Sequence, residues 1–203
     1  TKTNTVVATV EVNGIEGIAV SPDGKKVYVT GSGYTDVIDT ETNKVIATVE
    51  TSESSGVVVS PDGKKVYVTS RLSGIIYIID ADTNTVVAEV SGGNYPIGID
   101  ISPDGAMLYI ANQDDHNVSV MDTTTSIIKT TISVGNGPWS LAVTPDGEKI
   151  YVTNYFDDTV SVIDAATNTV TDTISVGDQP QSVAFKKSGS KAYVANSGSN
   201  TVS

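Results

Sequence analysis

Residues 140–177 read SLAVTPDGEKIYVTNYFDDTVSVIDAATNTVTDTISVG, and the rest of the chain repeats this stretch with small changes. Its Pro-Asp-Gly triplet recurs at spacings of 39, 42 and 42 residues, beginning at Pro22, Pro61, Pro103 and Pro145. A degenerate fifth copy falls at residues 186–189, and a tyrosine-centred segment follows each copy. A repeat of this length has to be interpreted as one structural unit before any single motif is considered.

Each repeat holds four short segments rich in Val, Ile, Thr and Tyr, with turn residues between them and no helical periodicity. Proline presets φ at the second position of a tight turn, and glycine takes the left-handed conformation that follows. A second kind of turn ends in Thr-Asn, as at Thr42-Asn43. Four antiparallel strands in about 42 residues, repeated in tandem, are typical of a propeller blade. The sequence therefore predicts an all-β fold, a β-propeller of four-stranded antiparallel blades.

Five copies of the turn and its tyrosine strand predict five blades in a single domain over residues 1–203. The chain begins with residues 1–4, which match the turn at residues 165–168, and it ends in the first half of a third strand. We therefore expect an N-terminal strand at residues 5–12 to complete the last blade, which would close the ring without exposed edges. The alternative is a fragment of a seven-bladed ring. The start at Thr1, without a methionine, also indicates a processed or excised segment.

Composition narrows the range of partners. The net charge of -12 and the pI near 4.3 argue against binding to nucleic acid or to an anionic membrane surface. No run of about 18 apolar residues is present, so we expect no membrane insertion. Cysteine is absent, which excludes disulfides, thiolate nucleophiles and thiolate metal sites.

The fourth repeat carries a recognisable motif. Residues 151–154 read YVTN, with PDG at residues 145–147 before them and VID at residues 162–164 after them. This pattern resembles the YVTN β-propeller repeat, a family that includes surface-layer proteins of methanogenic archaea and whose members usually have seven blades. The resemblance implies an extracellular or cell-surface location. Similar repeats occur in propeller domains of some redox enzymes and resemble those of lactonase-type propellers, so the resemblance fixes no chemistry.

A unique binding site has to lie where the repeats differ, because identical copies cannot form one. Aromatic and polar single residues collect in the variable loops that we expect around the mouth of the propeller channel. The ligand-binding residues that we expect there are Tyr95, His116, Trp139, Tyr155, Phe156 and Arg71. Such a cluster suits stacking on a sugar ring or binding of a peptide. The alternative interpretation is that Trp139 and Phe156 fill the top of the channel or pack between blades.

Other polar residues give weaker signals. Hard cations bind clustered carboxylates, and four loop aspartates could form such a cluster. They lack the spacing of a dedicated calcium loop, so we expect no metal. We also expect no cofactor. These weak metal candidates are Asp114, Asp115, Asp157 and Asp158. Asp100 lies on an expected innermost strand where other repeats carry Ala or Val, and we interpret it as a structural polar substitution. Asn117 begins the only Asn-x-Ser/Thr triplet, a glycosylation acceptor if the protein is secreted.

These observations lead to one expected function and two alternatives. We expect a non-enzymatic extracellular or cell-surface module that binds a protein or glycan partner at the channel mouth. No catalytic set is recognisable, since a single histidine in a loop gives no Ser-His-Asp arrangement. The first alternative is a lactonase- or lyase-type enzyme with its site at the channel mouth. The second is a structural subunit that self-associates by strand exchange.

Overall fold

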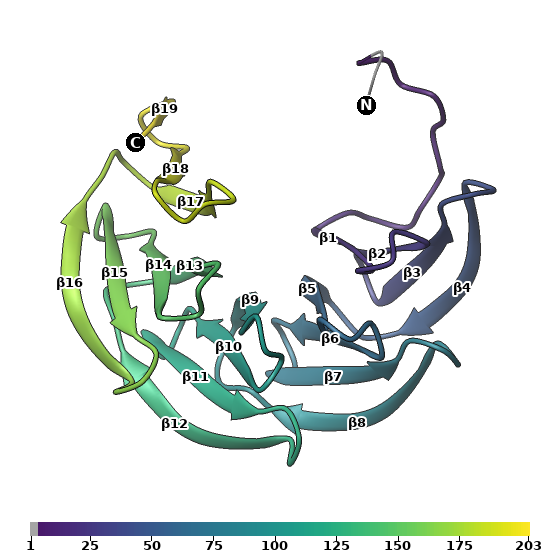
Figure 1. Ribbon diagram of the computed structural model, residues 1–203, viewed down its shortest axis with the longest axis horizontal. Helices are drawn as coiled ribbons and strands as arrows, with labels where there is room; N and C mark the ends of the chain where they lie inside the picture. Colours follow the sequence, from purple (N-terminus) through teal and green to yellow (C-terminus); the bar gives the residue numbers. More distant parts are fainter. Residues whose placement is uncertain (1–3) are drawn as a thin grey trace.

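The computed structural model describes residues 4–203, and all its regular elements within that range are β-strands. Five antiparallel sheets follow one another around a central axis (Figure 1). The strands are β1 (Gly17–Val20), β2 (Lys26–Thr30), β3 (Tyr34–Asp39), β4 (Lys44–Glu50), β5 (Ser54–Val59), β6 (Lys65–Ser70), β7 (Ile75–Asp80), β8 (Thr85–Ser91), β9 (Pro96–Ile101), β10 (Met107–Asn112), β11 (Asn117–Asp122), β12 (Ile127–Ser133), β13 (Pro138–Val143), β14 (Lys149–Asn154), β15 (Thr159–Asp164), β16 (Thr169–Ser175), β17 (Pro180–Phe185), β18 (Ala192–Asn196) and β19 (Thr201–Val202). Across the described range, no helix has the length and apolar character needed to span a membrane.

The five sheets confirm the predicted fold, an all-β five-bladed β-propeller. Within each blade, strands that are consecutive in the sequence pair with each other, in the order β1-β2-β3-β4 and its repeats. The first strand of each blade, namely β1, β5, β9, β13 or β17, lies nearest the axis, and the fourth strand lies at the rim (Figure 1). The fifth blade has three strands, β17, β18 and β19.

The structure corrects the prediction for the N-terminal segment. Residues 4–12, where we expect the strand that completes the last blade, form no strand, and Val6 and Val7 are exposed. The physical reason is the shortness of the neighbour that this strand would need, since β19 pairs with β18 through only two residue pairs. Residues 1–3, which belong to the expected preceding turn, lie outside the described residues.

The Pro-Asp-Gly turns form as predicted, and their aspartates have a role beyond turn propensity. The Asp23 carboxylate accepts hydrogen bonds from the Ser21 hydroxyl (2.7 Å) and the Lys25 amide (3.0 Å). These hydrogen bonds, the Ser21 hydroxyl first, lower the pKa of Asp23. Gly24 has φ near +72°, the left-handed conformation that this turn requires. The same arrangement recurs at Asp62, Asp104 and Asp146.

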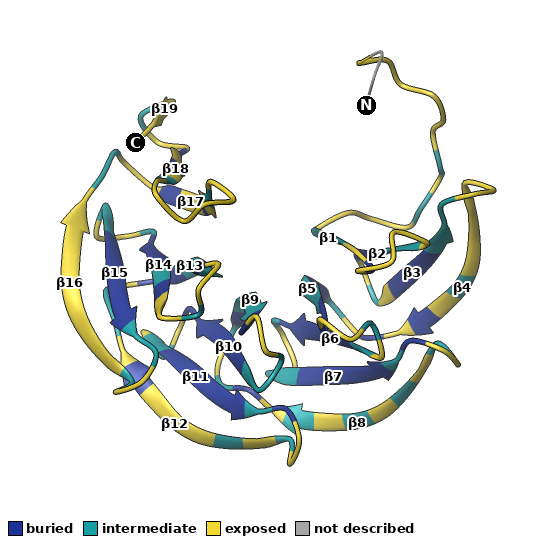
Figure 2. Cartoon of the chain, in the orientation of Figure 1, coloured by how far each residue is buried: buried dark blue, intermediate teal, exposed yellow. Residues whose placement is uncertain are grey.

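The hydrophobic core is divided among the interfaces between successive blades. The second and third strands of the middle blades are the most deeply buried, whereas β16 at the rim is exposed along its whole length (Figure 2). Tyr67 from the second blade packs against Leu108 and Ile110 of the third, and the other interfaces repeat this arrangement. At the two ends of the arc some side chains lack a neighbouring blade: Tyr193, which corresponds to Tyr67, is 49% exposed, and Ile18 on the inner strand β1 is 68% exposed.

Near the axis the inner strands approach so closely that side chains are excluded. A Cβ atom built on Gly56 would lie 2.4 Å from the Ile97 carbonyl oxygen of the next blade. Gly17 and Gly98 face the backbone of the following blade in the same way. The Thr69 hydroxyl, which belongs to the YVT motif, also donates to the Ile97 carbonyl oxygen (2.9 Å). Glycine in the inner strand and threonine in the second strand therefore join adjacent blades.

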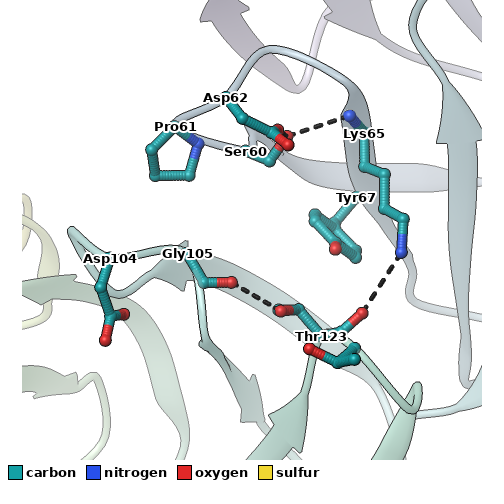
Figure 3. Close-up of a pocket in the computed structure, with 9 residues that line it drawn as sticks. Ser60, Pro61, Asp62, Lys65, Tyr67, Asp104, Gly105 and Thr123 are labelled. Atoms are coloured by element: carbon teal, nitrogen blue, oxygen red, sulfur yellow. Dashed lines mark hydrogen bonds between the residues drawn. The ribbon is translucent and has the colours of Figure 1, made fainter.

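A crevice opens between the turns of adjacent blades on the face that carries the Pro-Asp-Gly turns. In the crevice between the second and third blades, about 370 Å³ in volume, Lys65 Nζ donates to the Thr123 carbonyl oxygen and Thr123 Oγ1 donates to the Gly105 carbonyl oxygen (Figure 3). Similar crevices lie between the first and second blades and between the third and fourth. Because they are built from repeated residues, we interpret them as consequences of blade packing rather than as a unique site.

Candidate functional site

The cavity whose lining differs most between repeats lies on the axis, where the inner strands of all five blades begin. Its volume is about 400 Å³. One position of the repeat contributes a different residue from each blade, and these residues are Glu16, Ser55, Ile97, Trp139 and Gln181. This ring of unlike side chains is what a selective pocket in a repeat protein requires. We call this space the axial cavity.

Charge in the axial cavity centres on Arg71, which follows β6. Its Nη2 atom lies 3.2 Å from Glu16 Oε1 and 3.8 Å from Glu53 Oε2. The Arg71 amide also donates to the Glu53 carbonyl oxygen (3.2 Å), which fixes the loop. All three side chains are partly exposed, so solvent screens these ion pairs. The cavity thus presents a guanidinium group held between two carboxylates.

Aromatic rings form one wall of the axial cavity and continue away from it. Tyr95 and Trp139 line the cavity. The Trp139 ring stacks on Tyr155, with ring centroids 4.9 Å apart, and Phe156 meets Tyr155 edge to face at 5.1 Å. Trp139, Tyr155 and Phe156, which were singled out in the sequence, thus lie together in the structure, and their role in ligand binding stays a prediction. Phe156 itself is exposed and packs beside Gly137, where a Cβ atom would lie 2.3 Å from the ring.

His116 lies apart from the cavity lining. It has φ near +51°, and its Nδ1 atom accepts a hydrogen bond from the Gly137 amide (3.2 Å). Val134 in turn donates its amide hydrogen to the His116 carbonyl oxygen (3.1 Å). The geometry gives His116 the role of connecting two loops of adjacent blades. Of the six expected binding residues, Arg71, Tyr95 and Trp139 line the cavity, Tyr155 and Phe156 extend from it, and His116 does not reach it.

The acidic loop residues also connect loops. Asp115 accepts hydrogen bonds from the backbone and side-chain amides of Asn94, and Asp157 accepts one from the Asn136 amide. Asp158 accepts one from the Gln179 amide (2.8 Å). Within residues 4–203 no three or more His, Asp or Glu side chains are grouped as a metal site would need, which gives these aspartates and Asp114 no support as ligands.

The side-chain oxygen Oδ1 of Asn117 accepts a hydrogen bond from the side-chain amide of the buried Asn112 (2.8 Å). The Asn117 side chain therefore already contributes a hydrogen bond to the β10–β11 hairpin. Glycosylation of Asn117 stays a prediction.

Asp100 connects the third and fourth blades. Its Oδ2 atom accepts a hydrogen bond from the Val143 amide of β13 (2.8 Å), and its Oδ1 atom accepts one from the Ile101 amide (2.9 Å). Burial raises the pKa of Asp100, and the two backbone hydrogen bonds oppose this effect. The carboxyl group is not part of the axial cavity lining, so its contacts agree with the structural interpretation.

Replacement of Asp100 by asparagine is expected to change how stability depends on pH. Because the folded-state pKa is raised above 3.8, the protonated carboxyl contributes stability below that pH, and this contribution is lost as pH rises through the folded-state pKa. The wild type should therefore lose stability relative to Asp100→Asn as pH rises from about 3 through the raised folded-state pKa. Urea unfolding of both proteins across this range measures the difference. A difference that stays constant or changes in the other direction would contradict the prediction.

Several cavity residues were not predicted from the sequence. Glu16, Ser55 and Gln181 line the cavity and belong to loops that vary between the repeats, but they carry no motif. The same holds for Glu53, which lies outside the lining and pairs with Arg71. Ser55 is buried, and its hydroxyl has no hydrogen-bond partner among the residues that the structure describes. A buried hydroxyl without a partner is costly, so it is a candidate to bind a ligand in the cavity.

The fold and the axial cavity define the class of protein: a β-propeller whose unique residues gather at one end of its channel. More specifically, residues 34–138 match the family described as lactonase, seven-bladed β-propeller. This match spans just over half of the chain, and the chain belongs to that family. The family is described as seven-bladed, and the described residues of this chain form five blades.

This family membership corrects the expectation of a non-enzymatic module, because the matching family is named for an enzyme activity. The absence of a recognisable catalytic motif was a poor guide here. The fold brings together residues from separate repeats, as the Arg71–Glu16 ion pair shows, and such a group leaves no motif in the sequence. The finer resemblance to surface-layer YVTN proteins remains an interpretation.

Solved structures support the fold over almost the entire chain. Hydrazine synthase of Kuenenia stuttgartiensis is 25% identical with a TM-score of 0.86, and the match covers 95% of this chain and 58% of that one. A functionally unknown protein from Desulfotomaculum acetoxidans is 19% identical with a TM-score of 0.84, covering 98% of this chain and 70% of that one. The Cps50 (Swd1) β-propeller domain from Myceliophteria thermophila is 14% identical with a TM-score of 0.82, covering 94% and 65%. No curated protein sequence matches the chain.

Proposed function

We propose that this propeller hydrolyses a small cyclic ester bound in the axial cavity. The observation that carries the proposal is the Arg71–Glu16 pair, 3.2 Å apart, on the wall of a cavity of about 400 Å³. Membership of the lactonase family supports a lactone as the substrate. Cavities of this size suit small ligands, and the aromatic wall offers Trp139 and Tyr95 as apolar surfaces for a ring.

The roles of the two charged groups follow from ester chemistry. Glu16 accepts a proton from a water molecule as the water oxygen forms a bond to the lactone carbonyl carbon. Arg71 stabilises the negative charge that develops on the carbonyl oxygen. The ring C–O bond then breaks, and the leaving oxygen takes the proton from Glu16 to give an open hydroxy acid. Glu53 holds the guanidinium in place from its other side.

Acid release from gluconolactone and from butyrolactone, followed at constant pH, tests this proposal. The wild type should release acid faster than the spontaneous rate, and Glu16→Gln should lower kcat by about 10²- to 10⁴-fold, the usual contribution of a general base. Glu50→Gln, a change on the rim strand β4, is the matched control and should retain full activity. Rates equal to the spontaneous rate, or equal rates for Glu16→Gln and the wild type, would refute the proposal.

The extracellular or cell-surface location, the protein or glycan partner and self-association by strand exchange stay predictions. The acidic composition and the repeat resemblance support the location. Fractionation of cells that produce the protein, followed by detection of the chain in each fraction, tests it directly.

A further inference from the structure

The charges that face the axial cavity contain information about its ligand. Among residues 4–203, Arg71 is the one cationic residue that lines the cavity, and its guanidinium lies 3.2 Å from Glu16 and 3.8 Å from Glu53. Two carboxylates around one guanidinium leave this group with one excess negative charge. The chain as a whole carries a net charge of -12, which adds to the negative potential. An anionic ligand would therefore meet repulsion before it could reach Arg71.

Apart from Arg71 and Glu16, the described residues of the lining are uncharged, and several carry hydrogen-bonding groups. Hydroxyl groups come from Ser55, Ser140 and Ser182, and an amide comes from Gln181. The Ser55 hydroxyl is buried without a partner among the described residues, and a ligand hydroxyl could satisfy it after a small movement of this side chain. Trp139 adds an aromatic surface of the kind on which sugar rings stack. Together these groups match a ring that carries several hydroxyl groups.

We infer that the axial cavity selects an uncharged, hydroxyl-rich ring, so that the substrate is a sugar lactone without a phosphate or carboxylate group. That the ring is a lactone rests on the proposed function, whereas the preference for an uncharged ring follows from the cavity residues alone. Arg71 acts here as a hydrogen-bond donor held by Glu16 and Glu53, and it does not act as a counter-ion. An anion would have to separate the Arg71–Glu16 pair and lie beside two carboxylates, which opposes binding.

Intrinsic fluorescence measures binding at this site directly, because Trp139 is the only tryptophan of the chain. The probes are anhydroglucitol, an uncharged ring that cannot be hydrolysed, and its phosphate monoester. We expect saturable change of the Trp139 signal with anhydroglucitol and about tenfold or more weaker binding of the phosphate ester at low salt. Equal or tighter binding of the phosphate ester, or no saturable change with anhydroglucitol, would overturn the inference.

The double variant Glu16→Gln, Glu53→Gln tests the cause of the selectivity. It frees the charge of Arg71, so the phosphate ester should then bind at least as tightly as anhydroglucitol. The three side chains are partly exposed, so folding should be retained, and circular dichroism checks this. An unchanged order of affinities in the folded variant would contradict the inference.

The binding experiment and the hydrolysis experiment test the selectivity and the proposed reaction separately. Saturable binding of anhydroglucitol without acid release from any lactone would leave the uncharged selectivity intact and refute the proposed reaction. Acid release from butyrolactone with no preference between the two ring probes would support the proposed reaction and refute the uncharged selectivity. The two experiments therefore distinguish the inference from the function on which it builds.

Discussion

Replacement of Gly56 by valine is expected to cost the protein at least about 3 kcal/mol of unfolding free energy. A Cβ atom at this position would lie 2.4 Å from the Ile97 carbonyl oxygen and 2.9 Å from Ile99 Cγ2 of the next blade. The nearer atom belongs to the backbone, so no change of rotamer relieves the clash, and the second and third blades have to separate. This separation would also break the hydrogen bond from the Thr69 hydroxyl to the Ile97 carbonyl oxygen. Thermal unfolding should show a midpoint lowered by roughly 6–12 °C.

A matched control lies at the same position of the repeat in the fifth blade. Ser182 already carries a Cβ atom there, so Ser182→Ala should change stability by no more than about 0.5 kcal/mol. If Gly56→Val melted at the wild-type temperature, the close approach of β5 and β9 would not be a requirement of the fold. Because Gly56 also lines the axial cavity, its effect on activity should be interpreted only where the variant is folded.

The repeated parts of the fold could be predicted because they depend on local chemistry. The turn that begins at Pro22 and includes Gly24 requires residues with restricted or left-handed backbone angles, and these are visible in the sequence. The strands between the turns follow from β-branched and aromatic residues. The N-terminal segment shows the limit of this approach. Residues 5–12 resemble a fourth strand, but a strand needs a paired neighbour, and β19 offers only two residue pairs.

The site could be predicted only in part, because it is assembled from five separate repeats. Arg71, Tyr95 and Trp139 stand out as exceptions within the repeat, and they line the cavity. Glu16 was not predicted, because its importance comes from its distance to Arg71, which depends on how the blades are arranged around the axis. His116 looked equally exceptional, but its backbone conformation directs it to the neighbouring loop. A residue type that is rare in the repeats identifies a candidate site residue. Only the structure distinguishes residues that line the cavity from residues, such as His116, that connect neighbouring loops.

The change Tyr67→Ala is expected to cost about 3–5 kcal/mol of unfolding free energy, the usual range for a buried aromatic side chain. Tyr67 is 1% exposed and belongs to the core cluster that joins the second blade to Leu108 and Ile110 of the third. Alanine would leave a cavity at this interface, because the inner strands on either side are held by their own hydrogen bonds and cannot collapse to fill it. Urea unfolding followed by circular dichroism measures the loss.

Tyr193 provides the comparison, since it is the same residue type at the same position of the fifth blade. Both tyrosines pair with the second-to-last residue of the inner strand, Tyr67 with Val58 and Tyr193 with Ala184. No following blade covers Tyr193 among the described residues, and 49% of it is exposed, so Tyr193→Ala should cost less than about 1 kcal/mol. Equal losses for the two variants would mean that a further element covers Tyr193 in solution. A much larger loss at Tyr67 would locate the stability of the propeller in contacts between blades rather than in the blades themselves.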